Sequence, residues 1–132
     1  MNELPNQWLG KAEDDISFAT LGLEHHYYSQ VCFLAQQASE KSLKGLLISK
    51  TAKHPHLHNL RELVARCAEH VPEIRPLEEI ARILDQYYIP SRYPDGIPGG
   101  LSIPVCLQKN THEKHWMELA KSVHFVRRGF AK

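Results

Sequence analysis

An excess of charge of one sign is missing from this chain. Lysine and arginine total 16 against 15 acidic residues, so the formal net charge is +1 at pH 7. A dedicated duplex-DNA-binding domain usually carries a strong basic excess. The near balance argues against that class of protein, while it leaves room for a local basic site.

Cysteine is also scarce. The chain has three cysteines, Cys32, Cys67 and Cys106, and no two of them form a CxxC pair. Such wide spacing excludes a zinc ribbon and a thioredoxin-type motif. We expect three free thiols, as in the reducing cytoplasm.

Long apolar runs are absent too. No stretch approaches the roughly 20 residues that a membrane-spanning helix needs. The first residues, Met1 to Pro5, lack the basic and apolar regions of a signal peptide. We therefore expect a cytoplasmic protein without a membrane partner, and the length of 132 residues predicts a single domain over 1–132.

Period-two alternation is missing over any useful length, whereas apolar residues recur at spacings of three and four in every long segment. This pattern predicts an all-α protein. The expected helices cover about 6–24, 27–50, 57–70 and 76–89, with a last one from about 111, Asn6 capping the first and Pro76 opening the fourth. Because helices joined by short turns pack as antiparallel neighbours, the predicted fold is an up-and-down bundle of four main helices plus one shorter helix.

Proline and glycine gather between these last two helices. Residues 90–110 hold four prolines and three glycines, and so long a loop in a compact domain is often functional. Arg92 in this loop can present its planar fork to phosphate or carboxylate, or pair with Asp85 or Asp95 and fix the loop. Asp95 precedes Gly96, which is common turn chemistry and favours a structural role.

The second predicted helix carries a cluster of polar residues. Lys41 and Lys44 lie close together, with Gln37 one turn before Lys41, and could form a cationic patch for phosphates. The alternative is a solvated face with internal ion pairs, since Glu40 and Lys44 have the favourable i, i+4 order.

Histidines alternate around Pro55, at His54, His56 and His58. Closely spaced histidines can bind a metal, but no cysteine lies nearby, so we expect no metal site. The simpler role for His58 is to cap or anchor the third helix.

Three segments together resemble a known family. They are Ala35–Leu47 (AQQASEKSLKGLL), His58–Asn59–Leu60, and Leu84–Asp95 (LDQYYIPSRYPD). Their order and spacing resemble the HEPN family, the higher eukaryotes and prokaryotes nucleotide-binding domain, in its RYPD-containing prokaryotic type. The resemblance extends from Trp8 to the final helix.

The resemblance implies a HEPN-like helical bundle that forms a homodimer, binds a nucleotide or RNA and needs no cofactor. Trp116, Tyr87 and Tyr88 are candidates for the dimer contact. The residues that it marks for ligand binding are Arg92, Tyr93, Asp95, Lys41, Lys44, Gln37 and His58. We expect Arg92 to line a cleft shared with Gln37, Lys41 or Lys44.

One departure from the family bears on catalysis. HEPN RNases carry an Arg-x(4–6)-His motif that assists attack by a ribose 2′-hydroxyl. No histidine follows Arg92 at that spacing, and only three residues separate Arg66 from His70. Binding is therefore favoured over catalysis.

The resemblance also implies a partner. Minimal nucleotidyltransferases often accompany HEPN proteins in two-gene toxin–antitoxin pairs. Two alternatives stay open: a metal-independent RNase toxin that uses Arg92 with a histidine such as His58, and a structural adaptor.

Overall fold

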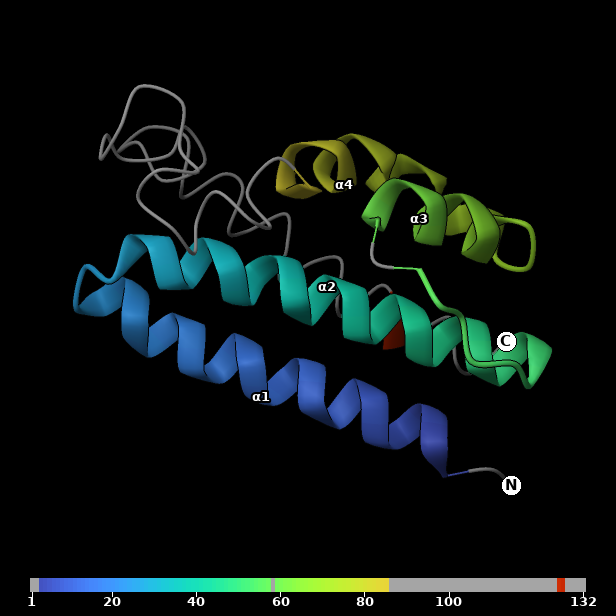
Figure 1. Ribbon diagram of the computed structural model, residues 1–132, viewed down its shortest axis with the longest axis horizontal. Helices are drawn as coiled ribbons and strands as arrows, with labels where there is room; N and C mark the ends of the chain where they lie inside the picture. The colour runs from blue at the N-terminus through green and yellow to red at the C-terminus, as the bar shows by residue number, and fades with distance from the viewer. Residues whose placement is uncertain (1–2, 58, 86–125, 128–132) are drawn as a thin grey trace.

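The computed structural model describes residues 3–57, 59–85 and 126–127, and every structural statement below concerns this part of the chain (Figure 1). Its elements are α1 (Leu4–Glu24), α2 (Tyr28–Thr51), α3 (Leu60–Ala68), the 3₁₀ helix η1 (Pro72–Leu77) and α4 (Glu78–Asp85). The described ranges contain no strand, so the predicted all-α class is confirmed. Residues 90–110 and most of the last predicted helix lie outside them.

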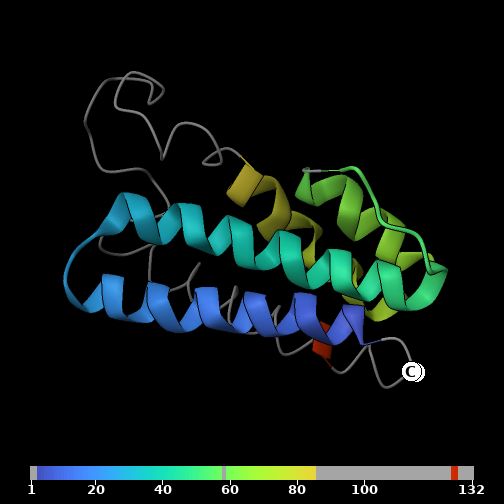
Figure 2. The same cartoon turned by 60° about the horizontal axis from the view of Figure 1, so that its bottom comes forward.

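Helices α1 and α2 form an antiparallel hairpin, and they lie side by side along their lengths in both Figure 1 and Figure 2. The chain reverses at His26, whose φ of 65° is left-handed. At this end of the hairpin a Cβ on Gly22 would lie 3.2 Å from Cγ2 of Val31. Glycine at this position therefore lets the two helices approach closely.

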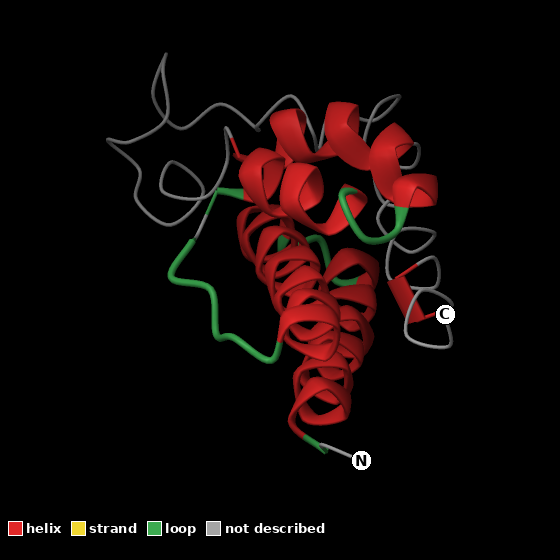
Figure 3. Ribbon diagram, turned by 90° about the vertical axis from the view of Figure 1, so that its right-hand side faces the viewer, coloured by secondary structure: helices red, strands yellow, loops and turns green. Residues whose placement is uncertain are grey.

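A second layer, made of α3, η1 and α4, lies across α2 on the side away from α1 (Figures 1 and 3). α2 ends at Thr51, and its C-cap Ala52 adopts a left-handed φ of 58° and donates its N–H to the carbonyl of Ile48. No helix within the described residues is long and apolar enough to cross a membrane.

Three helix starts differ from the prediction by two residues or more. α1 begins at Leu4 rather than at Asn6, because Pro5 fits the first turn of a helix. α3 begins only at Leu60, since Asn59 is its N-cap and the Asn59 side chain accepts the N–H of Glu62. His58, the expected cap, lies outside the described residues.

The expected start of the fourth helix at Pro76 is wrong. Pro76 lies inside η1, which begins at Pro72, and α4 follows at Glu78. Proline needs no N–H partner in the first turn, and 3₁₀ turns commonly lead into α-helices.

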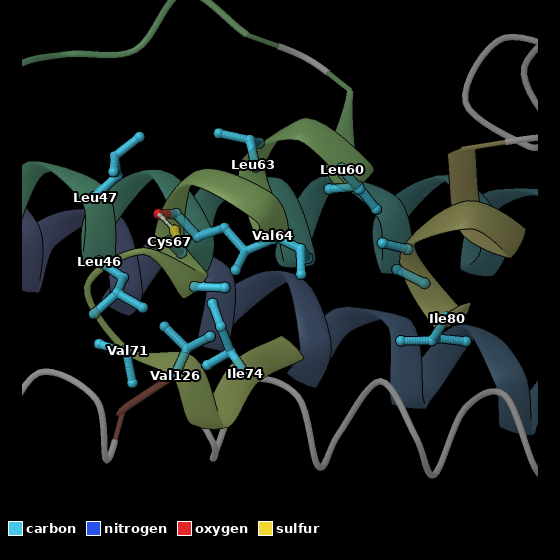
Figure 4. Packing of buried hydrophobic residues seen from close by; sticks show 14 residues of the cluster. Leu46, Leu47, Leu60, Leu63, Val64, Cys67, Val71, Ile74, Ile80 and Val126 are labelled. Atoms are coloured by element: carbon cyan, nitrogen blue, oxygen red, sulfur yellow. Dashed lines mark hydrogen bonds between the residues drawn. The ribbon is translucent and has the colours of Figure 1, made fainter. Parts of the chain in front are cut away.

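The main hydrophobic core lies between α2 and the second layer (Figure 4). Its fully buried members include Leu46, Leu60, Leu63 and Ile74. Val126, far away in the sequence, is also fully buried there, and the neighbouring Arg127 forms an ion pair with Glu13 of α1. The end of the chain thus contributes to the same core.

The cysteines differ from the expected three free thiols. Cys67 is free and buried, and its Sγ donates to the carbonyl oxygen of Leu43 at 3.3 Å. Burial raises the pKa of this thiol to about 12, so it stays protonated and unreactive. Cys32, however, is disulfide-bonded, so the expectation of a free thiol is wrong at this position.

Candidate functional site

One stripe of polar residues on α2 faces inward. Gln36, Ser39, Glu40 and Lys44 follow the spacing of one helical stripe and are 0%, 6%, 6% and 4% exposed. Lysine and glutamate are rarely buried to this extent unless they are paired. The solvated polar face that the sequence allowed is therefore not present at Glu40 and Lys44.

Lys44 is held by an acid on its own helix and by a ring on α1. Its Nζ lies 3.8 Å from Oε2 of Glu40, one turn earlier. The same nitrogen lies 5.8 Å from the ring centroid of Trp8, within the range of a cation–π interaction. The i, i+4 pair expected from the sequence is present, but it lies inside the bundle.

Lys41 and Gln37 are engaged as well. Nζ of Lys41 donates to Oδ2 of Asp15 at 2.6 Å, in a half-buried contact that ties α2 to α1. Nε2 of Gln37 donates to Oε1 of Gln36 at 2.7 Å. A phosphate arriving at Lys41 would have to compete with the Asp15 carboxylate.

Four of the predicted ligand-binding residues, Arg92, Tyr93, Asp95 and His58, lie outside the described part of the chain, as do Tyr87, Tyr88 and Trp116. The cleft expected between Arg92 and α2 therefore stays a prediction.

Asp85 is the last described residue before the Arg92 segment. Its Oδ1 accepts the backbone N–H of Leu60 at 2.9 Å, and its Oδ2 accepts that of Arg61 at 3.2 Å. The first N–H groups of a helix have no partner within the helix, so Asp85 and Asn59 together cap α3. This contact fixes the end of α4 beside the start of α3.

Burial raises the pKa of the Asp85 carboxyl. The hydrogen bonds from Leu60 and Arg61 and the charge of Arg61 act in the opposite direction, but burial is the larger effect. No local motif could have revealed this role, because the partners lie 25 and 24 residues apart.

A small cavity adjoins the polar stripe of α2. It is lined by Ser39 and Ser42 of α2 and by apolar residues of the second layer, including Leu60 and Ile80. Oγ of Ser39 is buried there and has no hydrogen-bond partner among the described residues. Sequence reasoning missed this hydroxyl, since a serine within a helix is usually exposed.

The histidine segment lies against α1. The rings of His54 and Trp8 are 5.3 Å apart and edge-on, and the ring of His56 lies 5.6 Å from that of His54. Within the described residues no group of three or more histidine, cysteine or acidic side chains could hold a metal ion.

Comparison with known proteins places this bundle in a family. The HEPN domain matches residues 5–125. The crystal structure of TT1696 from Thermus thermophilus is 33% identical with a TM-score of 0.83, covering 98% of this chain and 99% of that chain. The structure of ST0689, an archaeal HEPN homologue, is 25% identical with a TM-score of 0.73 and the same coverage.

The comparison with curated proteins gives no match. The HEPN match spans nearly the whole chain, α2 and its buried polar stripe included, and both solved structures align over almost their full length. The chain belongs to the HEPN domain family.

Proposed function

We propose that this protein is a non-catalytic HEPN module that binds a nucleotide or RNA. The observation that carries the proposal is the HEPN match over residues 5–125, because the family supports a nucleotide-binding or RNase-like module. The missing histidine after Arg92 supports binding rather than RNA cleavage.

Arg92 is the central residue of the proposed site, with Lys41, Lys44 and Gln37 as its neighbours. Two contacts support this arrangement. α4 packs against the Ser39 and Ser42 turn of α2, and Asp85 fixes the end of α4 at the start of α3. Arg92 follows Asp85 by seven residues, a reach of up to about 25 Å. Lys41, the half-exposed member of the group, is then the first lysine that a phosphate would meet.

Replacing Arg92 by alanine is expected to weaken binding of RNA or of a nucleotide about ten-fold or more, because a charge-assisted hydrogen bond is lost. The measurement is fluorescence anisotropy with labelled RNA and titration calorimetry with nucleotides, each at two salt concentrations, since phosphate contacts release counterions.

The matched control is Arg82→Ala. Arg82 is exposed and pairs with Glu79 on the surface, where such a bridge contributes little. An Arg92→Ala protein that binds as tightly as wild type but melts much earlier would make Arg92 a structural residue and contradict the proposal.

We also propose that the module is a homodimer, since symmetric dimers are the commonest oligomers. Phe18 and Leu21, spaced i, i+3 on α1, are 66% and 57% exposed and suit an apolar contact between copies. Phe18→Glu is expected to convert a dimer to a monomer in light scattering at micromolar concentration. The exposed neighbour Ser17 provides the control Ser17→Glu. A wild-type protein of monomer mass would refute the dimer.

The proposed partner is a minimal nucleotidyltransferase in a toxin–antitoxin-like pair. This part of the proposal rests on the frequent association of HEPN proteins with such enzymes. A gene for a small nucleotidyltransferase beside this one would support it.

A further inference from the structure

A second hollow lies away from the polar stripe, where the end of α2, the connection after it and the end of α3 meet. Its volume is about 680 Å³, within the range of small-molecule sites. The described residues that line this hollow include none of the residues of the site proposed above.

Two cations without ion-pair partners line this hollow. Lys53 comes from the connection and Arg66 from the last turn of α3, and neither forms an ion pair within the described residues. Among the described residues of the lining, Glu69 is the single acid. Lys41 and Lys44, by contrast, already face carboxylates. Lys53 and Arg66 can therefore accept an anion without first losing a partner among the described residues, and the arginine fork suits phosphate.

Rings and apolar side chains complete the lining. His54, His56 and His70 contribute imidazoles, and Pro55 and Leu57 contribute apolar surface. The ring of His54 lies 5.3 Å from that of Trp8 and 5.6 Å from that of His56. This surface suits a planar ring system, because aromatic groups pack in offset or edge-on pairs at such distances.

The ends of α2 and α3 offer another explanation for the basic residues. Helix C-termini carry partial negative charge, and lysine, arginine or histidine in the last turn stabilises them. That effect accounts for a basic residue near each helix end. It does not explain why two cations and three imidazoles, which come from the connection after α2 and from the end of α3, line the same open hollow.

We propose that this hollow binds a small molecule that carries both a phosphate ester and a planar ring, such as a nucleoside monophosphate. Lys53 and Arg66 bind the phosphate oxygens, and His54 and His56 pack against the ring. The inference rests on the nucleotide binding proposed above and adds a second site, whose residues are separate from Arg92, Lys41 and Lys44.

The test is titration calorimetry of the full chain with adenosine monophosphate, inorganic phosphate and adenosine. The variant Lys53→Gln/Arg66→Gln is expected to raise the Kd for adenosine monophosphate about ten-fold or more. The control Arg75→Gln/Arg82→Gln makes the same change in net charge at exposed residues outside the lining and is expected to leave the Kd unchanged. Wild type is expected to bind adenosine monophosphate more tightly than inorganic phosphate or adenosine.

Several results would overturn the inference. Equal Kd values for the lining variant and its control would do so, as would wild-type protein that binds none of the three probes. Unchanged binding with a lower melting temperature would assign Lys53 and Arg66 to the helix ends alone. Equal affinity for phosphate and adenosine monophosphate would overturn the ring contact. Binding lost in Arg92→Ala but kept in Lys53→Gln/Arg66→Gln would overturn this site and leave the function proposed above intact.

Discussion

Replacing Glu40 by alanine is expected to lower the free energy of unfolding by about 3–5 kcal/mol, because it removes the carboxylate that faces the buried ammonium of Lys44. The side chains of Lys44 and Glu40 are only 5% and 8% exposed. The interaction of Lys44 with the Trp8 ring remains. A buried cation–π contact contributes about 2 kcal/mol, but it does not replace the charge of a carboxylate. Urea unfolding followed by circular dichroism measures the loss.

Two further variants separate burial from the ion pair itself. The double variant Glu40→Leu/Lys44→Met removes both charges and is expected to lose far less stability than Glu40→Ala, since apolar replacements of buried pairs are often neutral or stabilising. Glu79→Ala breaks an exposed pair with Arg82 and is expected to cost about 1 kcal/mol or less. Similar losses for Glu40→Ala and Glu79→Ala would show that the pair in α2 is not buried in solution.

The Glu40–Lys44 pair also shows what residue spacing alone can predict and what it cannot. The i, i+4 order of Glu40 and Lys44 correctly predicted that they pair, because helical geometry is local. Their burial depends on which elements cover α2, and α1 and the second layer cover it on two sides (Figure 3). Nothing in the spacing of a helix states which neighbours it will have.

The positions of the helices could be predicted from the sequence, but not all of their first residues. The bounds of α2 differ from the prediction by one residue at each end, since no proline interrupts its apolar pattern. The start of α3 was misplaced because the capping residue is Asn59, and that of α4 because a 3₁₀ turn begins at Pro72. Such details depend on competition between neighbouring turn and cap residues.

The candidate sites depend more than the helix bounds do on contacts between residues that are far apart in the sequence. The histidines around Pro55 stood out in the sequence, but Arg66 and His70 join them only because the end of α3 packs beside the connection. Arg92 stood out through its loop and its family motif, and its role stays a prediction.

Asp85 is the clearest case of a long-range role, and its loss is expected to be costly. Asp85→Ala removes the acceptors of the Leu60 and Arg61 N–H groups and is expected to lower the free energy of unfolding by about 1–3 kcal/mol. Asp85→Asn keeps one acceptor oxygen and is expected to lose less. Asn59→Ala, which removes the local cap of the same helix, should cost about 1 kcal/mol. An Asp85→Ala protein as stable as wild type would show that the α3 N-terminus does not depend on this carboxylate.

The pH dependence of stability in wild type and Asp85→Asn gives a second prediction, in which the direction of the change is fixed. Burial raises the folded-state pKa of Asp85 above its ordinary value, so on acidification the folded protein takes up this proton before the unfolded chain does. Wherever the folded state binds more protons, stability falls as pH rises. The charged carboxylate at neutral pH is therefore the less favourable form, and its cost disappears as pH falls through the folded pKa towards the unfolded one. Because Asp85→Asn has no proton to gain, wild type is expected to gain stability relative to Asp85→Asn when urea unfolding is compared at neutral and acidic pH. A relative loss on acidification would mean that the backbone hydrogen bonds outweigh burial at this carboxyl.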